Sequence, residues 1–466
     1  MKHISIFIAA FLFSILFFEK NIGLNLTIFS IVTTVLLVGY NSKKFKDKTI
    51  ILHALVYIFT ALLVFIQHSS LSIITNCITF FTLVGVVSEQ RTSIYVHWLN
   101  GIYTTVAGYF HRTFESNTDA KKVNWKKDID VLHVAKLIGI PLVFILVFIM
   151  LYKNGNPMFN NLVSRIDFSF INFQWLLFTV LGYYLFNNIS KPVQVDPATS
   201  TDLKTQSTLF KSGTFSEEKL KKEKQLGTVL LGFLNLLIVV YIITDIIYVI
   251  TGETISASAF SSQVHSGINT LIASIIIAIM IILYFFRGNL NFYAENRALK
   301  NLSFLWIFLN VMLIVLIAIK NQNYITAFGL TYKRIGVHIY ILLTFIGLIT
   351  TWIKVLKVKN LAFLFRRNTQ IAFIVLLVCS TINWDYTITK YNLNVAKSFD
   401  IGYLINLTNR NAILLNKKKD DINISSADKH RIETKYSKHM MALAERDWQE
   451  WNYEMFENET KFNSTE

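Results

Sequence analysis

Proline, cysteine and charged side chains are scarce in this sequence. Its 466 residues include four Pro and two Cys, and only 16% of them are charged. Soluble globular proteins are about one quarter charged, so this composition argues against a soluble domain. Two cysteines cannot build a disulfide framework, and so few prolines leave room for long uninterrupted helices.

The common motifs of catalysis and of metal or nucleotide binding are missing as well. There is no C-x-x-C, H-E-x-x-H, G-x-x-x-x-G-K-S/T, G-x-G-x-x-G or G-x-S-x-G pattern, and the ten His residues are scattered. Cys77 and Cys379 lie in separate apolar runs, where we expect them to face lipid or other helices. The sequence therefore predicts no enzymatic activity, no cofactor and no metal site.

Apolar and aromatic side chains are abundant instead. Hydrophobic residues make up 53% of the chain, with 38 Phe and 20 Tyr. A helix needs roughly 20 mostly apolar residues to cross a bilayer, because its backbone polar groups must be satisfied within the segment. We therefore expect an all-α integral membrane protein with about 11 transmembrane helices. The predicted spans are residues 4–18, 22–40, 49–66, 71–88, 137–152, 172–189, 226–250, 268–286, 302–319, 336–353 and 370–384.

The two ends of the chain raise separate questions. Lys2 and His3 precede an apolar run, as in a secretory signal, but Glu19 and Lys20 stand where a small-residue cleavage site should follow. We therefore expect an uncleaved first helix. Residues 1–384 then form a polytopic transmembrane domain, and residues 385–466, called the tail below, form a small helical extramembrane segment.

The distribution of Lys and Arg predicts the orientation. With a cytoplasmic N-terminus, the inner segments hold 27 Lys and Arg and the outer segments hold 6. Positive charge in short loops is retained on the cytoplasmic side, so we expect an extracytoplasmic tail. The inner segments are 1–3, 41–48, 89–136, 187–225, 287–301 and 354–369, and the outer segments are 19–21, 67–70, 153–171, 251–267 and 320–335.

Two segments allow more than one interpretation. Residues 94–110 are apolar and aromatic but interrupted by Gly and polar residues, which favours an in-plane helix or a half-span over a full crossing. The basic runs flank membrane helices, so anionic lipid headgroups are more plausible partners than nucleic acid. We expect the lipid bilayer itself to be the main environment, and the sequence does not determine an oligomeric state.

The tail carries signals of helical structure. Asp400 is placed as a helix N-cap, and residues 425–456 are predicted to form a longer amphipathic helix. Its apolar stripe packs on the tail's own short helices or, as the alternative, docks on a protein partner or the outer membrane surface. The stripe consists of Ile432, Tyr436, Met440, Leu443, Trp448, Trp451 and Met455.

Polar side chains inside predicted spans are candidates for functional or structural roles. Asp245 is flanked on its helix face by Tyr241 and Tyr248, so a phenol hydrogen bond to the carboxylate is possible; the alternative is an interfacial acid that faces headgroups. Asn310, near the middle of its span, is expected to hydrogen-bond to neighbouring helices. Asn76 and Asn235 are expected to do the same.

The stretch YITAFGLTYKRIG, residues 324–336, places two cations at the start of a predicted span. Thr331 is a plausible N-cap, and Gly329 can supply the turn before it. Cations in a first helical turn oppose the helix dipole, so something should compensate for them.

Two forms of compensation are expected. Lys333 can extend to lipid phosphates. The planar guanidinium of Arg334 favours a bidentate carboxylate, so we expect Arg334 to pair with Asp245 or Asp385.

Several residues here match the motifs of a known family. Their pattern resembles the bacterial membrane proteins of the domain-of-unknown-function 4173 (4153-type) family, with Thr408, Asn411 and Trp384 where Ser, Asp and Pro are usual. The resemblance implies a bacterial inner-membrane location and a tail outside the cytoplasm, and it brings no catalytic residue or cofactor. The matching residues are Tyr324, Gly329, Leu330, Thr331, Arg334, Lys390–Leu393, Asp400, Tyr403, Leu404, Leu407, Ala412 and Leu415.

Three classes of function remain open at this point. The first is a non-enzymatic envelope sensor, scaffold or accessory subunit, with a possible protein partner at the tail. The second is a membrane transporter or lipid-handling protein. The third is a membrane-embedded enzyme, for which the paired acids, activated nucleophile or converging His residues are not visible in the sequence. We favour the first class.

Overall fold

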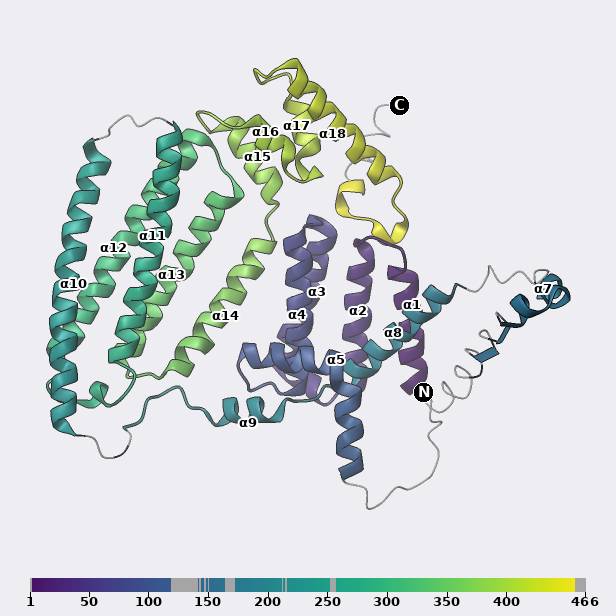
Figure 1. Ribbon diagram of the computed structural model, residues 1–466, viewed down its shortest axis with the longest axis horizontal. Coiled ribbons are helices and arrows are strands. Elements are labelled where there is room, and N and C mark those ends of the chain that lie inside the picture. The colour runs from purple at the N-terminus through teal and green to yellow at the C-terminus, as the bar shows by residue number, and fades with distance from the viewer. Residues whose placement is uncertain are drawn as a thin grey trace.

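A computed structural model describes residues 2–118, 141, 144–145, 148–149, 151–163, 172–211, 213, 216–251 and 257–456. Within these residues the chain is helical, with a single antiparallel bridge between Thr208 and Lys359. The expected all-α class is confirmed. Figure 1 shows two groups of roughly parallel helices side by side, with the tail across one end.

The first bundle is built from the N-terminal half of the chain. Ring stacking and aliphatic contacts fill its centre, where Leu37, Tyr57, Val84 and Phe186 are fully enclosed. Short caps define its helix ends, for example Asp47, whose side chain accepts the Thr49 amide. Its helices are α1 (Lys2–Phe17), α2 (Leu24–Tyr40), α3 (Lys48–Gln67), α4 (Ser70–Ser88), α5 (Ile94–Thr118) and α8 (Phe173–Ser190), with the short 3-10 helix η1 (Lys44–Lys46) between α2 and α3. The short helix α7 (Pro157–Val163) precedes α8 in the chain and lies apart from this bundle (Figure 1).

The second bundle follows a connecting helix, α9 (Asp196–Lys204). Its core contains Ile275, Phe286, Ile317 and Leu348, each shut off from solvent. The last helix of this bundle also contacts α3, α4 and α5, so it joins the two bundles (Figure 1). The helices are α10 (Glu217–Thr251), α11 (Ala257–Phe285), α12 (Arg297–Phe328), α13 (Tyr332–Leu356) and α14 (Leu361–Ser380), with the short helix η2 (Asn289–Phe292) before α12.

Ten of the predicted spans coincide with helices, and residues 137–152 lie largely outside the described residues. Six helices, namely α3, α4, α10, α12, α13 and α14, are long and apolar enough to cross a membrane. The total of about 11 crossings stays a prediction. Some bounds differ: the predicted span 370–384 is α14, which starts nine residues earlier because Asn360 caps it and its first turns contain Arg366 and Arg367.

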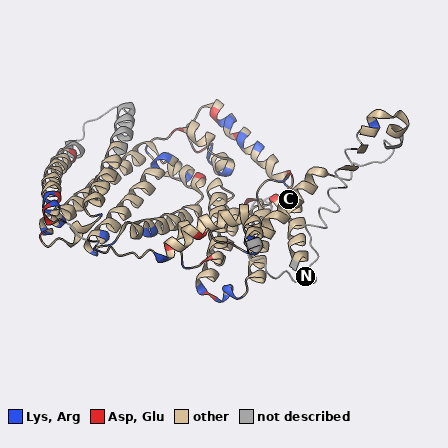
Figure 2. Ribbon diagram, turned by 60° about the horizontal axis from the view of Figure 1, so that its bottom comes forward, with Lys and Arg blue, Asp and Glu red and all other residues tan. Residues whose placement is uncertain are grey.

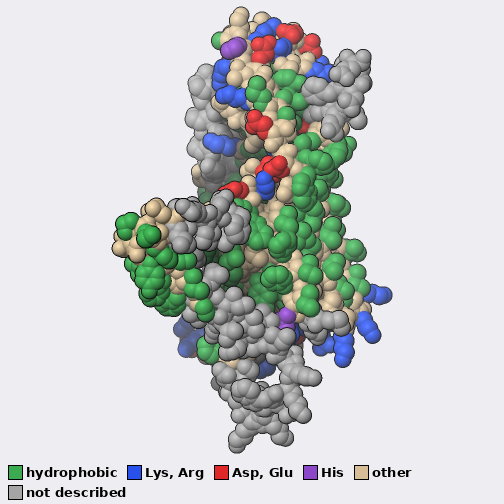
Figure 3. Space-filling view, turned by 90° about the vertical axis from the view of Figure 1, so that its right-hand side faces the viewer, with side chains coloured by type: hydrophobic (Ala, Val, Ile, Leu, Met, Phe, Trp, Pro, Cys, Tyr) green, Lys and Arg blue, Asp and Glu red, His purple; other side chains and the backbone are tan. Residues whose placement is uncertain are grey.

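Apolar side chains cover the outside of both bundles. Leu52, Leu55, Phe233 and Leu237 are all more than half exposed. Figure 2 shows Lys, Arg, Asp and Glu mainly near helix ends and on the tail, and Figure 3 shows a broad hydrophobic band between charged ends. Since apolar surface of this extent is unfavourable in water, the surface is that of a membrane protein.

Helix α5 lies at the end of the first bundle where α4 and α8 finish (Figure 1). Gly85 and Gly101 allow a close approach there, because an added Cβ would overlap the backbone of His97 or Phe81 on the facing helix. Further along, the Tyr109 amide donates to Asn188 of α8 at 2.7 Å. Whether residues 94–110 lie in the plane of the membrane stays a prediction.

The tail lies over the opposite end of both bundles (Figure 1). The predicted helix over residues 425–456 is shorter than expected and ends at Ala444. Ile432 and Leu443 are buried, and α18 packs on α16 and α17, so this part of the stripe covers the tail's own helices. Its elements are α15 (Trp384–Asn394), α16 (Ile401–Asn406), η3 (Asn409–Asn411), α17 (Ala412–Lys418), α18 (Ser426–Ala444) and η4 (Trp448–Glu450).

Candidate functional site at the junction of the tail and the bundles

The loop between α12 and α13 forms the base of the junction. Gly329 ends α12 with φ of +83°, a backbone conformation that L side chains rarely adopt, and a Cβ there would lie 2.7 Å from Asn392 Oδ1. Thr331 caps α13, and its hydroxyl accepts the Arg334 amide at 3.4 Å. The predicted roles of Gly329 and Thr331 are confirmed, and α13 starts at Tyr332.

The predicted pairing of Arg334 with Asp245 or Asp385 is wrong. The Arg334 guanidinium donates to Phe328 O at 2.8 Å and to Gly329 O, and it lies 3.9 Å from the ring centre of Tyr324. These carbonyls belong to the C-terminal end of α12, which carries partial negative charge and lacks intrahelical partners. The cation that opposes the dipole of α13 is therefore compensated by the dipole of α12.

Asp245 has a different partner, Lys320 of α12. Asp245 is 8% exposed, and its Oδ2 has no hydrogen-bond partner among the described residues. The Tyr241 hydroxyl interacts with this carboxylate, as expected. The side chain of Tyr248 lies outside the described residues. Asp245 faces α12 rather than headgroups, and it does not contribute to the junction.

Asn310, Asn235 and Asn76, which lie inside predicted spans, have different kinds of hydrogen-bond partner. Asn310 donates to Trp306 O of its own helix at 2.8 Å, and no bond from it to another helix is found in the described part. Asn235 bridges α10 to Leu302 O of α12 at 3.0 Å, as expected. Asn76 of α4 donates to Thr60 of α3 at 3.2 Å, also as expected.

Asp385 links the tail to α13. It is 1% exposed and lies in the first turn of α15, where a carboxylate is favoured by the helix dipole. Its Oδ1 accepts the Tyr332 hydroxyl at 2.6 Å, and its Oδ2 accepts the Thr408 hydroxyl. The carboxylate thus connects the start of α13, the start of α15 and the segment before η3.

A second contact binds the tail to the loop itself. Asn392 is 2% exposed and forms a two-way bond with Leu330, whose amide donates to Oδ1 and whose carbonyl accepts Nδ2 at 2.9 Å. The Tyr403 hydroxyl accepts the Tyr332 amide at 3.0 Å. The residues of the two family motifs, which are about sixty positions apart in sequence, therefore meet in one polar cluster.

Lys435 and Asn411 organise the tail internally. Lys435 Nζ donates to Asn411 Oδ1 at 2.7 Å and to Ile405 O and Leu407 O, both at 2.9 Å. Burial lowers the pKa of Lys435 to about 8. Sequence analysis did not select Lys435, because its partners are backbone carbonyls that no sequence pattern marks; Asn411 was only noted as a departure from the family motif.

A cavity of about 770 Å³ lies beneath the tail, between α13, α14 and the start of α4. One part of its wall is apolar and descends between α13 and α14. The other part is polar and lies at the tail. The apolar wall consists of Leu71, Ile335, Gly336, Ile339, Leu343, Ala372, Val375, Leu376 and Cys379, and the charged or titratable groups are His68, Tyr332, Asp385, Arg410, His439, Arg446 and Glu454.

The polar rim of the cavity joins the two bundles through the tail. Arg410 donates to Gln67 Oε1 at 2.9 Å, and Arg446 Nη2 lies 3.4 Å from His68 Nε2. His439 Nε2 lies 3.0 Å from Glu454 Oε1. Burial, together with the positive charges of Arg446 and Arg410, lowers the pKa of His68 to about 4, so its imidazole is neutral at pH 7.

The end of the tail binds the first bundle directly. Lys20 forms an ion pair with Asp447, and the Asn21 amide donates to Glu450 Oε1 at 2.7 Å. The Leu24 amide donates to Trp451 O at 2.8 Å. With the contacts of Asp385 and Asn392, the tail is bound to both bundles at the same end.

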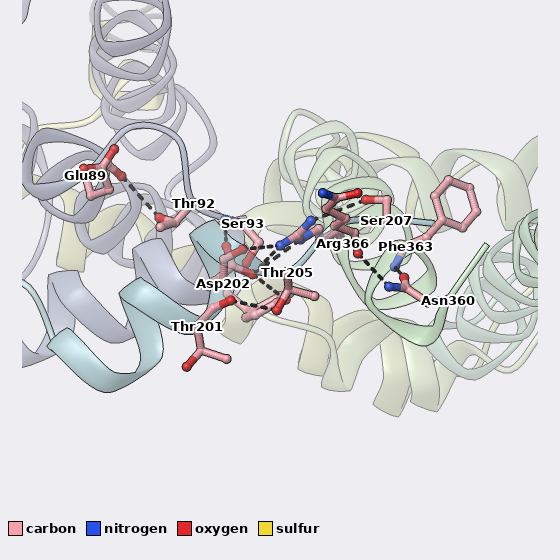
Figure 4. A network of polar contacts seen from close by, with 12 residues as sticks. Glu89, Thr92, Ser93, Thr201, Asp202, Thr205, Ser207, Asn360, Phe363 and Arg366 are labelled. Atoms are coloured by element: carbon pink, nitrogen blue, oxygen red, sulfur yellow. Dashed lines mark hydrogen bonds and ion pairs between the residues drawn. The ribbon is translucent and has the colours of Figure 1, made fainter. Parts of the chain in front are cut away.

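A further polar cluster joins the bundles at the opposite end (Figure 4). Asp202 of α9 is 8% exposed and accepts the Ser93 amide at 2.7 Å, the Tyr95 hydroxyl at 3.0 Å and Arg366 Nη2 of α14 at 3.1 Å. Burial opposes ionisation, but these donors outweigh it and hold the pKa of Asp202 below its usual range. Sequence analysis missed this cluster, because Asp202 lies in a polar connecting segment.

Among the described residues, no group of three or more His, Cys, Asp or Glu lies close enough to hold a metal ion. A family model described as a domain of unknown function (DUF4153) matches residues 7–417. The match covers both bundles and the tail as far as α17, and it confirms the 4153-type resemblance of the motifs. Searches of curated proteins and of solved structures found no match.

Proposed function

Because the chain belongs to the family described as a domain of unknown function (DUF4153), its role has to be inferred from geometry, and we propose a non-enzymatic envelope protein whose tail couples its two bundles. Such a protein would act as a sensor, scaffold or accessory subunit. The observation that carries the proposal is that the tail is bound to both bundles, through Asp385 and Asn392 at one and through Asp447 and Glu450 at the other.

We also propose a multi-pass protein of the bacterial inner membrane, with a cytoplasmic N-terminus and an extracytoplasmic tail. The segments rich in Lys and Arg support this orientation. Lys44–Lys46 and the start of α14, which contains Arg366 and Arg367, lie at the end opposite the tail (Figure 1). Exposed Met441 and Trp448 on the tail could contact a protein partner there.

Hydrogen exchange on the full-length protein in lipid nanodiscs tests the coupling. Asn392→Leu should release the tail from the α12–α13 loop. If the tail holds the bundles together, the Ser93 amide at the opposite end should then exchange faster than in the wild-type protein. Asn394→Leu is the matched control, since Asn394 lies on the same helix and is exposed. Faster exchange confined to the tail would contradict the coupling.

A lipid-handling protein or transporter is the second candidate. The specific observation in its favour is the cavity between α13 and α14, which combines an apolar wall with charged groups. Asp245, an acid inside a predicted span, is paired with Lys320 and does not line this cavity. A solute or lipid flux in proteoliposomes that depends on the lining of the cavity would support this candidate over the first.

A further inference from the structure

We propose that the cavity beneath the tail binds a membrane phospholipid, with its phosphate at Arg410 and Arg446 and an acyl chain between α13 and α14. This inference goes beyond the coupling proposed above and does not depend on it. It rests on the shape of the cavity and on the separation of its lining into an apolar and a polar part. It also rests on two buried hydrogen-bond donors at the polar end that have no partner among the described residues.

The cavity as a whole extends over about the depth of one membrane leaflet. Its lining on α13 runs from Tyr332 at the polar end to Leu343 at the apolar end, eleven positions that rise about 16 Å at 1.5 Å per residue. This is about half of the roughly 30 Å hydrocarbon core of a bilayer. A volume of about 770 Å³ also lies within the range of roughly 300–1,000 Å³ that is typical of ligand sites.

The spacing of the lining residues explains why the apolar wall is continuous. On α13 the residues recur every three or four positions, from Ile335 and Gly336 to Ile339 and Leu343, so they share one face of the helix. Gly336 leaves open space on this face, because a Cβ there would meet no atom within 4 Å. A facing set with the same spacing on α14 consists of Ala372, Val375, Leu376 and Cys379.

The polar end presents two guanidinium groups that no carboxylate neutralises by direct contact within the described part of the chain. Arg410 bonds to the neutral Gln67, and Arg446 bonds to the imidazole of His68. The nearby acids are engaged elsewhere: Asp385 accepts two hydroxyl groups, and Glu454 contacts His439. A planar guanidinium is well suited to bind phosphate through two parallel hydrogen bonds.

The unpartnered polar atoms at this end are hydrogen-bond donors. Arg446 can only donate, so His68 Nε2 must accept from it, and the neutral His68 ring therefore carries its proton on Nδ1. His68 Nδ1 and Arg446 Nη1 are both buried and have no partner among the described residues. Two buried donors require an acceptor, which selects an oxygen-rich anionic headgroup over an ammonium group.

The test measures binding of fluorescent phosphatidylglycerol to the full-length protein in neutral detergent. Arg410→Gln combined with Arg446→Gln should weaken binding about tenfold or more, since charge-assisted hydrogen bonds are lost. Arg431→Gln is the matched control, because Arg431 is an exposed Arg of α18 outside the cavity. Equal binding by the double variant and wild type would overturn the proposal.

The apolar end is tested separately, in case the double variant does not fold. Gly336→Leu should fill the space between α13 and α14 and exclude the acyl chain, whereas Gly232→Leu, in an open position on α10, should bind like wild type. Diacylglycerol with the same chains should bind at least about tenfold more weakly than phosphatidylglycerol, because it lacks the phosphate. Equal binding of both lipids, or no effect of Gly336→Leu, would overturn the proposal.

Free phosphate is the other possible source of the headgroup chemistry. Inorganic phosphate at millimolar concentration should not displace the labelled lipid, and displacement would identify a site for a soluble phosphate ester instead. Cys379 gives an independent readout in a Cys77→Ser background, because bound lipid should protect its thiol from maleimide. If the wild-type protein binds no lipid but Asn392→Leu still speeds exchange of the Ser93 amide, the lipid site alone is refuted and the coupling stands.

Discussion

At the scale of single residues, this protein places cations where backbone carbonyls need donors. Arg334 binds the last carbonyls of α12, and Lys435 binds three oxygens inside the tail. At the other end of the molecule, Lys44 donates to Val87 O at 2.6 Å and to Ser88 O at 3.2 Å, at the end of α4. The C-terminal ends of α4, α12 and α16 are therefore closed by Lys or Arg side chains that lie outside those helices.

This role of Arg334 predicts the outcome of its substitution. Arg334→Gln should lower the free energy of unfolding by roughly 1.5–3 kcal/mol, the range for hydrogen bonds to charged groups, because two carbonyls lose a charged donor. Thermal unfolding in detergent measures the change. Lys333→Gln, at the exposed neighbour, should stay within about 0.5 kcal/mol of wild type.

The same experiment separates this role from a carboxylate pair. If Arg334→Asp loses stability and Asp245→Arg or Asp385→Arg restores it, the carbonyl role of Arg334 is refuted and a direct ion pair is required.

At the scale of secondary-structure elements, α14 and the segments that follow α9 hold the bundles together. Helix α14 contacts α13 on one side and α3, α4 and α5 on the other. Arg366 of α14 donates to Asp202 of α9. The segment that follows α9 also binds the start of α14, because Asn360 Nδ2 donates to Gln206 O at 2.6 Å. A single helix therefore carries most contacts between the bundles in the described part.

The Asp202–Arg366 contact predicts a dependence of stability on pH. The pKa of Asp202 is lower in the folded protein than in the unfolded chain, so its stabilisation is present above about pH 4, the unfolded value, and is lost as pH falls through the folded value. Asp202→Asn should abolish this part of the acid sensitivity and cost roughly 1.5–3 kcal/mol at neutral pH.

Unfolding midpoints measured between pH 3 and 7 test this prediction. Asp196→Asn serves as the control, because Asp196 is an exposed acid of the same helix. An unchanged pH profile in the Asp202 variant would mean that the cluster does not contribute to stability.

At the scale of the whole molecule, the two ends differ in charge and in structure. Lys and Arg are frequent in the segments that join helices at the end opposite the tail, whereas the tail has 12 Lys and Arg against 13 Asp and Glu. Polar clusters connect the bundles at both ends, and the cavity with the apolar wall lies beneath the tail. The proposed lipid site and the proposed coupling of the bundles by the tail therefore lie at the same end of the molecule.

Reporter fusions test the orientation of the whole molecule. A periplasmic reporter fused after Asn383 or at the C-terminus should be active, because the charge distribution keeps the opposite end in the cytoplasm. A reporter fused within residues 205–215 should be active only if it is of the cytoplasmic type. An inactive periplasmic fusion after Asn383 would indicate an even number of crossings and point to residues 94–110 or the first helix as the error.

The sequence by itself determined the class of this protein and most of its helices, because apolar run length, caps and glycine turns are local properties. Thr331, Gly329 and Asp400 were assigned correctly for this reason. The family motifs also marked residues that meet in the polar cluster, although sequence could not show that they touch.

Only the tertiary structure decided which groups bind one another. Arg334 had several possible acceptors, and its choice of the α12 carbonyls depends on how α12 and α13 meet. Asp385 finds donors in two separate segments, and Asp202 finds donors at the start of α5 and on α14. A spacing rule within one helix cannot reveal such partners. The cavity likewise arises from faces of α13 and α14 that are ordinary apolar stripes until the tail covers them, because its shape depends on the packing of separate elements.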